Sequence, residues 1–583
     1  MSFVDAVPDY RDREMVCYFR EDPTTLVKRT YPLQDYFYFF LPSNTEQDTG
    51  YFDFHDRPLK KVSFETKREM LDYADGCPKK FESDIPVTYK FLLDNFMGYQ
   101  DHQPLNILLF DIEVDFDLTE GRGYPGPKNP YGEINAISCF DGTNRRYVMF
   151  VPASVADRVS LDDSEYDNFP VEVVYFHNER DLLLLFSVFL EPFDIISAWN
   201  GNHFDVPYII ERAMVHFGKS RGASLLCRDG IEASRRDFVN EYGEEVWEWT
   251  LRGRHHMDMM LLFKKFHAGE KRSFGLDSIC EEVLGIQKMD YDGDLGELFR
   301  ENPQAFFDYS LHDARLLMML ERKERTLELA LTMTRESCIL PVDIFGSIKH
   351  IEHDFQVYCR QNGGYVLPNR KNNVKDSFDG AVVFDTIKGR HEWIFGIDIV
   401  SEYPHIMMIL GMSPETVVGQ LRGEYEDYVR VMAEDDSAGS LVFGMDSAPG
   451  EEYHMLPSEF KALLKEQGWC LSAAGTVFNG KMGILSRWIY DNFQLRNEYK
   501  RKLKEARKAG DHGLAGVYDL RQNAIKIGRL NAVYGATGNE NFRLFDIRLS
   551  KSVTLTAQMV SKAQAIFANE YCNRAEKEAM TNG

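Results

Sequence analysis

Two carboxylates in the first fifth of the chain have the types and spacing of a metal site. Asp111 and Glu113 stand two residues apart at the end of the segment LNILLFDIE (105–113), whose apolar run predicts a buried strand. Side chains two apart on a strand point to one face, so we expect both carboxylates together at the rim of a buried sheet. Two acids there are costly unless a cation neutralises them.

A third carboxylate and a phenol–carboxylate pair follow farther along the chain. Asp205 lies in FDVPY (204–208), which we expect at a strand-to-helix turn, and Tyr309 and Asp313 are four residues apart, on one face of a predicted helix. Mg²⁺ takes carboxylate oxygens, and two such ions about 4 Å apart activate water for phosphodiester hydrolysis. Each piece alone is common on ordinary strands and helices. Their order and spacing of about a hundred residues are the specific signal.

The elements that must position these residues are read from hydrophobic periodicity and helix-forming composition. The sequence predicts an α/β and α+β multidomain protein, and its length fits roughly four domains of about 150 residues. We expect a strand over 107–112, helices over 182–190, 316–331, 496–508 and 550–571, a strand over 393–399, and a loop with a short helix over 424–440.

The order of the carboxylates resembles a known family. DIE (111–113), WN followed by FDVPY (199–208) and YxxxD (309–313) resemble the three exonuclease motifs of family B DNA polymerases, and SFGLDS (273–278) resembles a stretch between the second and third. The resemblance implies an RNase H-like 3′→5′ proofreading exonuclease domain. It implies metal ligation by Asp111, Glu113, Asp205 and Asp313, with Tyr309 orienting the attacking water.

A second resemblance covers the segment IDIVSEYP (397–404) and the SPET that follows at 413–416, which resemble the first polymerase motif of the same family. It implies that Asp398 is a catalytic metal ligand and that the ring of Tyr403 lies under the incoming sugar. Two residues depart from the pattern: Glu402 replaces the usual Leu, and His405 replaces the Ser after Pro. An extra carboxylate beside Asp398 could repel a triphosphate or bind a cation.

The basic run at 496–508 gains a role from this resemblance, since Arg496 and Lys500 match fingers-helix residues that grip the triphosphate. RQNAIK (521–526) leads to NAVYG (531–535), which resembles the second polymerase motif and implies that Lys526 touches the triphosphate while Asn531 and Tyr534 face the nascent base pair. Four residues separate Lys526 from Asn531 where the family has three, which turns a helix by about 100°. A π-bulge near Gly528 could absorb the extra residue; otherwise Arg529 could take over the contact.

The third polymerase motif, which carries the second palm aspartate, does not occur in these 583 residues. The nearest mimic, DYDGD (290–294), precedes the first polymerase motif and is expected to be a loop. Nucleotidyl transfer by two metals needs both carboxylates. We therefore expect the large N-terminal subunit of a split polymerase of tailed phages (myovirus type), completed by a C-terminal subunit with the third motif and thumb. Alternatives are a stand-alone exonuclease with a relict polymerase half, an artificial truncation, and a non-catalytic DNA-binding or assembly module.

The resemblance also implies a domain order. We expect an N-terminal domain at 1–104 to which 337–372 returns, the exonuclease at 105–336, the first part of the palm at 373–482, helical fingers at 483–539, and a palm continuation at 540–583.

Composition limits the class of protein. The formal net charge of −25 excludes a generally polycationic nucleic-acid coat, but not an enzyme with a local basic groove. Nine cysteines without a CxxC pair, a polar N-terminus and no long apolar run predict a reduced, soluble intracellular protein. The resemblance to tailed-phage polymerases implies the cytoplasm of an infected bacterial host. The implied cofactor is Mg²⁺, with Mn²⁺ as an alternative. The implied partners are primer–template and single-stranded DNA, deoxynucleoside triphosphates, the C-terminal subunit and a sliding clamp.

Overall fold

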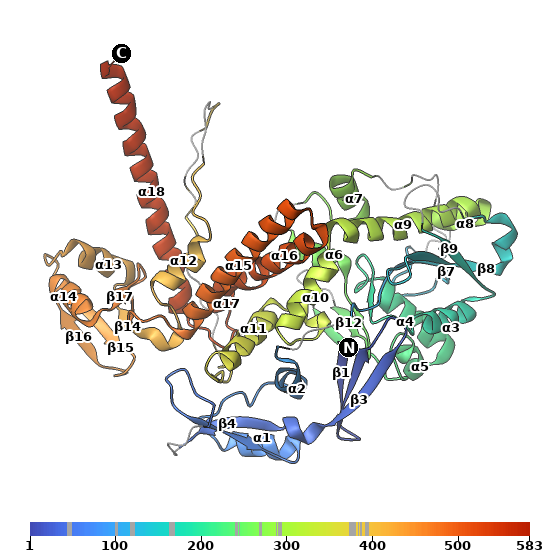
Figure 1. The fold of residues 1–583 in the computed structure, drawn as a ribbon, viewed down its shortest axis with the longest axis horizontal. Helices are drawn as coiled ribbons and strands as arrows, with labels where there is room; N and C mark the ends of the chain where they lie inside the picture. Colours follow the sequence, from blue (N-terminus) through green and yellow to red (C-terminus); the bar gives the residue numbers. More distant parts are fainter. Residues whose placement is uncertain are drawn as a thin grey trace. The chain divides into compact units, whose positions relative to one another are not determined.

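The computed structural model describes residues 1–582 except 44–48, 99–102, 117–122, 162–168, 240–242, 244, 268–270, 287–288, 290–293, 372, 374–379, 383, 385–387 and 391–395. Its contacts divide the chain into two compact units (Figure 1). Unit 1 comprises Met1–Phe37 and Pro86–Phe345, and unit 2 comprises Tyr38–Ile85 and Gly346–Gly583. Each unit contains one of the two groups of residues singled out from the sequence. The five-part domain order expected above stays a prediction.

A six-stranded mixed sheet forms the centre of unit 1, in the order β13-β10-β6-β7-β8-β9. Its strands are β6 (Ile107–Val114), β7 (Ile134–Asp141), β8 (Arg146–Pro152), β9 (Val171–Phe176), β10 (Ile195–Ser197) and β13 (His255–His256). The strand expected over 107–112 is thus confirmed, but the expected place at a rim is wrong. β6 lies inside the sheet, antiparallel to β7 and parallel to β10.

The helices of unit 1 include α9, which lies against β6 and β7, and α3, which lies against β9. They are α2 (Val87–Phe96), α3 (Glu179–Phe189), α4 (Asp205–Phe217), α5 (Lys219–Ser224), α6 (Met259–Phe266), α7 (Leu276–Leu284), α8 (Leu295–Glu301), α9 (Pro303–Glu324) and α10 (Thr326–Glu336). The helix expected over 182–190 is α3. The one expected over 316–331 is two helices, because Arg325 adopts a left-handed conformation (φ 54°) that ends α9.

Two smaller sheets and three short 3₁₀ turns complete unit 1. They are the antiparallel sheet of β1 (Ser2–Asp9), β2 (Glu14–Arg20) and β3 (Leu26–Pro32), the hairpin of β11 (Ser234–Val239) and β12 (Glu245–Thr250), and 3₁₀ turns at Leu33–Tyr36, Ala153–Arg158 and Pro341–Phe345.

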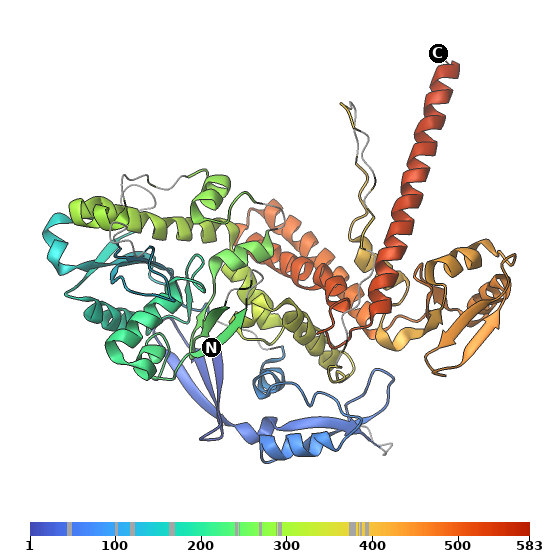
Figure 2. The same ribbon diagram turned by 180° about the vertical axis from the view of Figure 1, so that it is seen from behind.

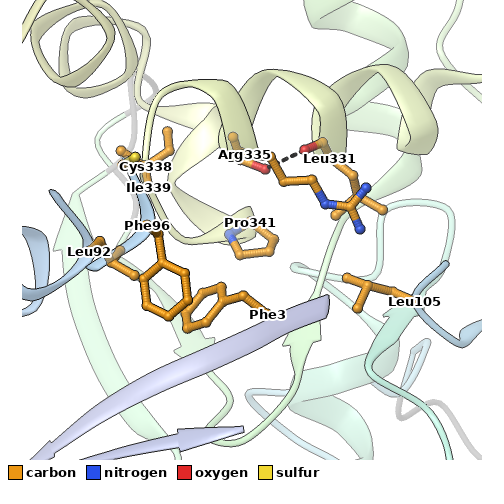
Figure 3. Close-up of a pocket in the computed structure, with 10 residues that line it drawn as sticks. Phe3, Leu92, Phe96, Leu105, Leu331, Arg335, Cys338, Ile339 and Pro341 are labelled. Carbon is orange, nitrogen blue, oxygen red and sulfur yellow. Dashed lines mark hydrogen bonds between the residues drawn. The ribbon is translucent and has the colours of Figure 1, made fainter. Parts of the chain in front are cut away.

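A small apolar pocket lies in unit 1, lined by residues of β1, α2 and α10 and of the segment after α10 (Figure 3). The rings of Phe3 and Phe96 meet there with centroids 4.8 Å apart. Its volume of about 40 Å³ suits a few water molecules and not a nucleotide. The pocket contains none of the residues predicted from the sequence to be catalytic.

Unit 2 contains a five-stranded antiparallel sheet in the order β16-β15-β14-β18-β17, covered by α13 and α14 through an apolar cluster that includes Val431 and Phe460. Its elements are β14 (Val417–Leu421), α13 (Glu424–Ala433), β15 (Leu441–Met445), β16 (Glu452–Met455), α14 (Pro457–Gln467), β17 (Cys470–Leu471) and β18 (Thr476–Phe478). The segment 424–440, expected as a loop with a short helix, is mostly the helix α13.

The remaining elements of unit 2 are helical apart from one hairpin. They are β4 (Tyr38–Pro42), β5 (Leu59–Ser63), α1 (Lys67–Asp75), α11 (Ser347–Gln361), α12 (Glu402–Ile409), a 3₁₀ turn (Pro414–Thr416), α15 (Ile484–Ala509), α16 (His512–Ile525), a π-helix (Lys526–Leu530), α17 (Ala532–Thr537) and α18 (Ile547–Asn582). The helices expected over 496–508 and 550–571 lie within α15 and α18. Figure 2 shows α15 and α16 side by side and α18 as one continuous rod.

Two sequence predictions fall wholly or partly outside the described residues. The loop expected at 290–294 lies outside the described residues except for Asp294, and the strand expected over 393–399 is described only from 396 on, where no strand is assigned. Within the described ranges, no helix is both long and apolar enough to cross a membrane.

Candidate catalytic sites

Alternation along β6 separates core side chains from acidic ones. Leu108, Phe110 and Ile112 join the apolar core of unit 1, and the alternate residues Asp111 and Glu113 face the other way. A register shift against β7 follows Glu113, which is a common feature beside functional sites. The sheet therefore presents both carboxylates on the face where α9 packs.

Three of the predicted ligands meet on this face. Carboxylate oxygens of Asp111, Glu113 and Asp313 all lie within 4.8 Å of one another, and Glu113 and Asp313 are buried. Asp313 lies one turn after the buried Tyr309 on α9, so the same helix brings the phenol and the carboxylate to the sheet. In the part of the chain that the structure describes, this is the one group of three or more potential metal-ligating side chains.

Asp205, the fourth predicted ligand, is the first residue of α4 and is 2% exposed. Its Oδ1 accepts a hydrogen bond of 3.3 Å from the backbone N–H of Ile112, the residue between Asp111 and Glu113. Burial, and next the Asp111 carboxylate, raise the pKa of Asp205 well above its ordinary value. A negative charge at this position is costly until a cation joins the group.

The turn that delivers Asp205 depends on two backbone features. Asn200 has a positive φ of 62°, and a Cβ on Gly201 would come within 2.6 Å of His256 Nε2 and 2.8 Å of Ala198 Cβ. The indole N–H of Trp199 donates to the Phe274 carbonyl oxygen at 2.9 Å. These contacts give the WNGNHFD segment a fixed path from β10 into α4.

The donor set fits hard divalent cations. All four side chains are carboxylates, three of them converge, and the fourth carries a raised pKa caused by its surroundings. Oxygen-only donors suit Mg²⁺ or Mn²⁺ and not the nitrogen- and sulfur-binding metals. Asp111, Glu113, Asp205 and Asp313 are the residues that would hold such ions.

In unit 2, Asp398 is exposed and precedes α12, which begins at Glu402 after the left-handed Ser401 (φ 54°). Burial raises the pKa of Glu402, a hydrogen bond from Ser561 opposes the rise, and the Asp398 charge adds to it. The extra carboxylate therefore does lie near Asp398, as the sequence suggested. His405, the other departure, donates from Nδ1 to the Ser401 carbonyl oxygen and packs edge-on against Phe493 of α15.

The SPET segment has a structural role that is not evident from the sequence. The Glu415 carboxylate accepts the backbone N–H of Ile484 at 2.7 Å, and the Ser413 hydroxyl accepts that of Leu485 at 3.2 Å, so both cap the start of α15. A Cβ on Gly483 would lie 2.4 Å from Ser413 Cβ. This contact fixes the helix that carries Arg496 and Lys500.

Three cations converge at the junction of α15 and the π-helix. Arg496 is largely buried, and its Nε has no hydrogen-bond partner among the described residues. Burial lowers the pKa of Lys500, and the charges of Arg496 and Lys526 lower it further. Arg496, Lys500 and Lys526 thus lie near one another, and a group of neighbouring cations attracts anions.

The π-helix accommodates the extra residue between Lys526 and Asn531 in the segment that resembles the second polymerase motif. It spans Lys526–Leu530 and contains Gly528, so the extra residue is absorbed as the π-bulge hypothesis predicted. After it, Tyr534 on α17 meets Tyr403 on α12 with ring centroids 4.6 Å apart, while Asn531 is exposed at the junction. The alternative that Arg529 replaces Lys526 is disfavoured, because its guanidinium binds Asp354 at 2.8 Å.

Several residues that support these sites were not anticipated. They are Gly201 in unit 1, and Gly483, Asn492 and Asp354 in unit 2, the last two being partners of Arg529. Gly483 stands well before the helix expected over 496–508, so the sequence carries no signal of its close contact. Beyond Asp398 and Glu402, no third potential metal ligand joins this group among the residues described in unit 2.

Comparison with known proteins agrees with this geometry. The sequence pattern of DNA polymerase family B matches residues 355–582, and that of the DNA polymerase family B exonuclease domain matches residues 78–279. The DNA-directed DNA polymerase of Escherichia phage RB69 is 26% identical over 90% of this chain and 62% of its own length. The DNA-directed DNA polymerase of Enterobacteria phage T4 is 26% identical over 92% of this chain and 64% of its own length. The DNA polymerase delta catalytic subunit of Oryza sativa subsp. japonica is 28% identical over 80% and 39%.

The two matched regions together span most of the chain. The exonuclease match contains Asp111, Glu113 and Asp205 and ends before Tyr309 and Asp313, and the polymerase match contains the candidate site of unit 2. The chain belongs to family B of the DNA-directed DNA polymerases and includes the exonuclease domain of that family. The mixed α/β fold class predicted from the sequence is confirmed at this level. The chain spans slightly less than two thirds of the length of the two phage relatives.

Proposed function

We propose that unit 1 is a 3′→5′ exonuclease that removes nucleotides from single-stranded DNA ends. The observation that carries this proposal is the convergence of Asp111, Glu113 and Asp313, with Asp205 hydrogen-bonded to the strand between the first two. When bound, two divalent ions supply the activated water and stabilise the leaving oxygen. The carboxylates hold the ions, and Tyr309 orients the water that forms the new P–O bond as the bond to O3′ breaks.

The second part of the proposal concerns unit 2, which supplies half of a polymerase site. Asp398 is the first metal-binding carboxylate, Tyr403 lies under the incoming sugar, and Arg496, Lys500 and Lys526 hold the triphosphate. Asn531 and Tyr534 face the new base pair. The edge-to-face Tyr403–Tyr534 pair and the neighbouring cations Arg496, Lys500 and Lys526 favour a working nucleotide site over a relict one.

Nucleotidyl transfer then requires a second palm carboxylate. These 583 residues lack the third motif, so we propose that further polypeptide supplies it together with the thumb. The split arrangement, in which that polypeptide is a separate C-terminal subunit, is the form we favour. The partners are primer–template, single-stranded DNA, deoxynucleoside triphosphates and a sliding clamp, with Mg²⁺ as cofactor and Mn²⁺ as a substitute. The resemblance to phage enzymes favours phage DNA replication in the cytoplasm of an infected bacterium.

The exonuclease proposal is tested on 5′-labelled single-stranded DNA with Mg²⁺. The chain should shorten the DNA stepwise from the 3′ end, and Asp313→Ala should reduce the rate at least about a hundredfold, since general acid–base and metal contacts contribute that much. Asp308→Asn is the matched control, because Asp308 lies on the same helix but pairs with Gln304 outside the carboxylate group. Equal activity of wild type and Asp313→Ala would overturn the proposal.

A further inference from the structure

The π-helix between the two halves of the second polymerase motif is held by a specific anchor. Within it, the backbone N–H of Asn531 donates to the carbonyl oxygen of Lys526 at 3.0 Å, a bond that closes over five residues instead of four. Lys526 and Asn531 therefore keep the relative direction that residues four apart have on an α-helix. A π turn is strained and persists only where its surroundings favour it.

Arg529, inside the π-helix, makes two contacts that hold this turn. Its guanidinium donates to Asp354 Oδ1 on α11 at 2.8 Å and to Asn492 Oδ1 on α15 at 2.9 Å. The side chains of Arg529 and Asp354 are 13% and 3% exposed, so the ion pair lies in a poorly solvated place where it is strong and directional.

The α15 partner lies on the same stripe as the predicted triphosphate residues. Asn492, Arg496 and Lys500 follow one another at four-residue spacing, so they share one face of α15. Asn492 is itself fixed, because its Nδ2 donates to the Trp488 carbonyl oxygen at 2.8 Å. Arg529 thus ties the π-helix to the helix face that carries Arg496 and Lys500.

We propose that Arg529 is a positioning residue for the triphosphate site, acting through Lys526. Its two contacts keep the π turn closed and Lys526 beside Arg496 and Lys500, although three like charges repel one another. The inference rests on the proposed nucleotide site of unit 2. On this proposal, the contacts of Arg529 preserve the relative direction of Lys526 and Asn531, which the extra residue between them would otherwise change.

A purely structural role of the Arg529–Asp354 ion pair predicts a different experimental result from a positioning role. Loss of a structural pair lowers the stability of unit 2 but leaves the affinity for triphosphate unchanged at temperatures well below unfolding. Loss of a positioning pair lowers the affinity and does so only while Lys526 is present to be positioned. The interaction between substitutions at 529 and 526 therefore separates the two roles.

The experiment measures binding of a fluorescent dTTP analogue to the whole chain in Mg²⁺ at low salt. Arg529→Gln should weaken binding about tenfold, the contribution of a hydrogen bond to a charged group. Asp354→Asn should do the same, and Arg529→Lys should have a smaller effect because it keeps the charge but not the forked contact. Arg507→Gln, which removes an exposed ion pair between α15 and Asp519 of α16, is the control and should not change the affinity.

The decisive comparison is Lys526→Ala against Lys526→Ala with Arg529→Gln. The account predicts equal affinities for these two variants. The positioning role would be overturned if Arg529→Gln weakened the affinity of the Lys526→Ala variant by a further factor. It would also be overturned if Arg529→Gln alone bound the analogue as tightly as wild type. Either result would leave the nucleotide site in place. Failure of the unsubstituted chain to bind the analogue would overturn the nucleotide site itself, and the inference with it.

Discussion

Asp205 shows how the exonuclease site carries an electrostatic cost in the absence of metal. Burial, with the nearby Asp111 charge, raises the pKa of Asp205, so the folded state retains a proton that the unfolded chain releases. The free energy of unfolding of the metal-free chain therefore falls as the pH rises above the ordinary aspartate value of 3.8 towards the raised value. Divalent cations should reverse this loss.

We predict that Asp205→Asn stabilises the metal-free chain at pH 8 by about 1–3 kcal/mol, in the usual range of single-site effects, because it removes a buried charge. The same variant should lose exonuclease activity and most of the stabilisation that Mg²⁺ confers on wild type. Urea unfolding with EDTA or Mg²⁺ measures both effects. Asp308→Asn should retain the Mg²⁺ effect, and an undiminished Mg²⁺ effect in Asp205→Asn would refute its role as a ligand.

Tyr309 should contribute less to the rate of 3′-end removal than the carboxylates do, because a phenol that orients water does not bind the metal ions. We expect Tyr309→Phe to lower the rate of 3′-end removal by about tenfold, as for loss of one hydrogen bond to a reacting group, while leaving the Mg²⁺ dependence unchanged. Single-turnover cleavage at several Mg²⁺ concentrations tests this. A shifted Mg²⁺ dependence would show that the phenol acts on the ions.

At the scale of elements, α15 depends on the cap that the SPET segment provides. Glu415→Ala should lower the stability of unit 2 by about 0.5–2 kcal/mol, the range for helix caps replaced by Ala, because it removes the acceptor of the Ile484 N–H. Gly483→Ala should be at least as harmful, because its Cβ would meet Ser413 at 2.4 Å. Thermal unfolding measures both, with Gly513→Ala on α16 as a control glycine that has room for a Cβ. Unchanged stability of Gly483→Ala would contradict the close contact.

The sequence predicted the elements whose signals are local. The apolar run before Asp111 indicated β6, and the basic helix-forming run indicated α15, whereas the place of β6 inside the sheet depends on partners distant in sequence. The break at Arg325 was missed because a left-handed Arg has no sequence signature. The π-helix was anticipated only because a counted spacing differed from a known pattern. Its anchor, Asp354, lies 175 residues away from Arg529 and could not be predicted.

At the scale of the whole molecule, a net charge of −25 coexists with local groups of cations. We predict that binding of single-stranded DNA weakens steeply with salt, with a slope of log K against log [salt] of about −0.7 per phosphate contacted. Fluorescence anisotropy between about 50 and 200 mM salt measures this slope. Binding independent of salt would show that the chain contacts bases alone, in conflict with a backbone-tracking groove.

The central claim is an intact exonuclease beside half of a polymerase site, and one measurement tests it most directly. The purified chain is incubated with a 5′-labelled primer–template, Mg²⁺ and all four deoxynucleoside triphosphates, and primer length is followed. The account predicts that the primer shortens and is never extended. Extension by this chain alone would contradict it, because these residues would then supply a second catalytic carboxylate beside Asp398, with Glu402 as the first residue to substitute.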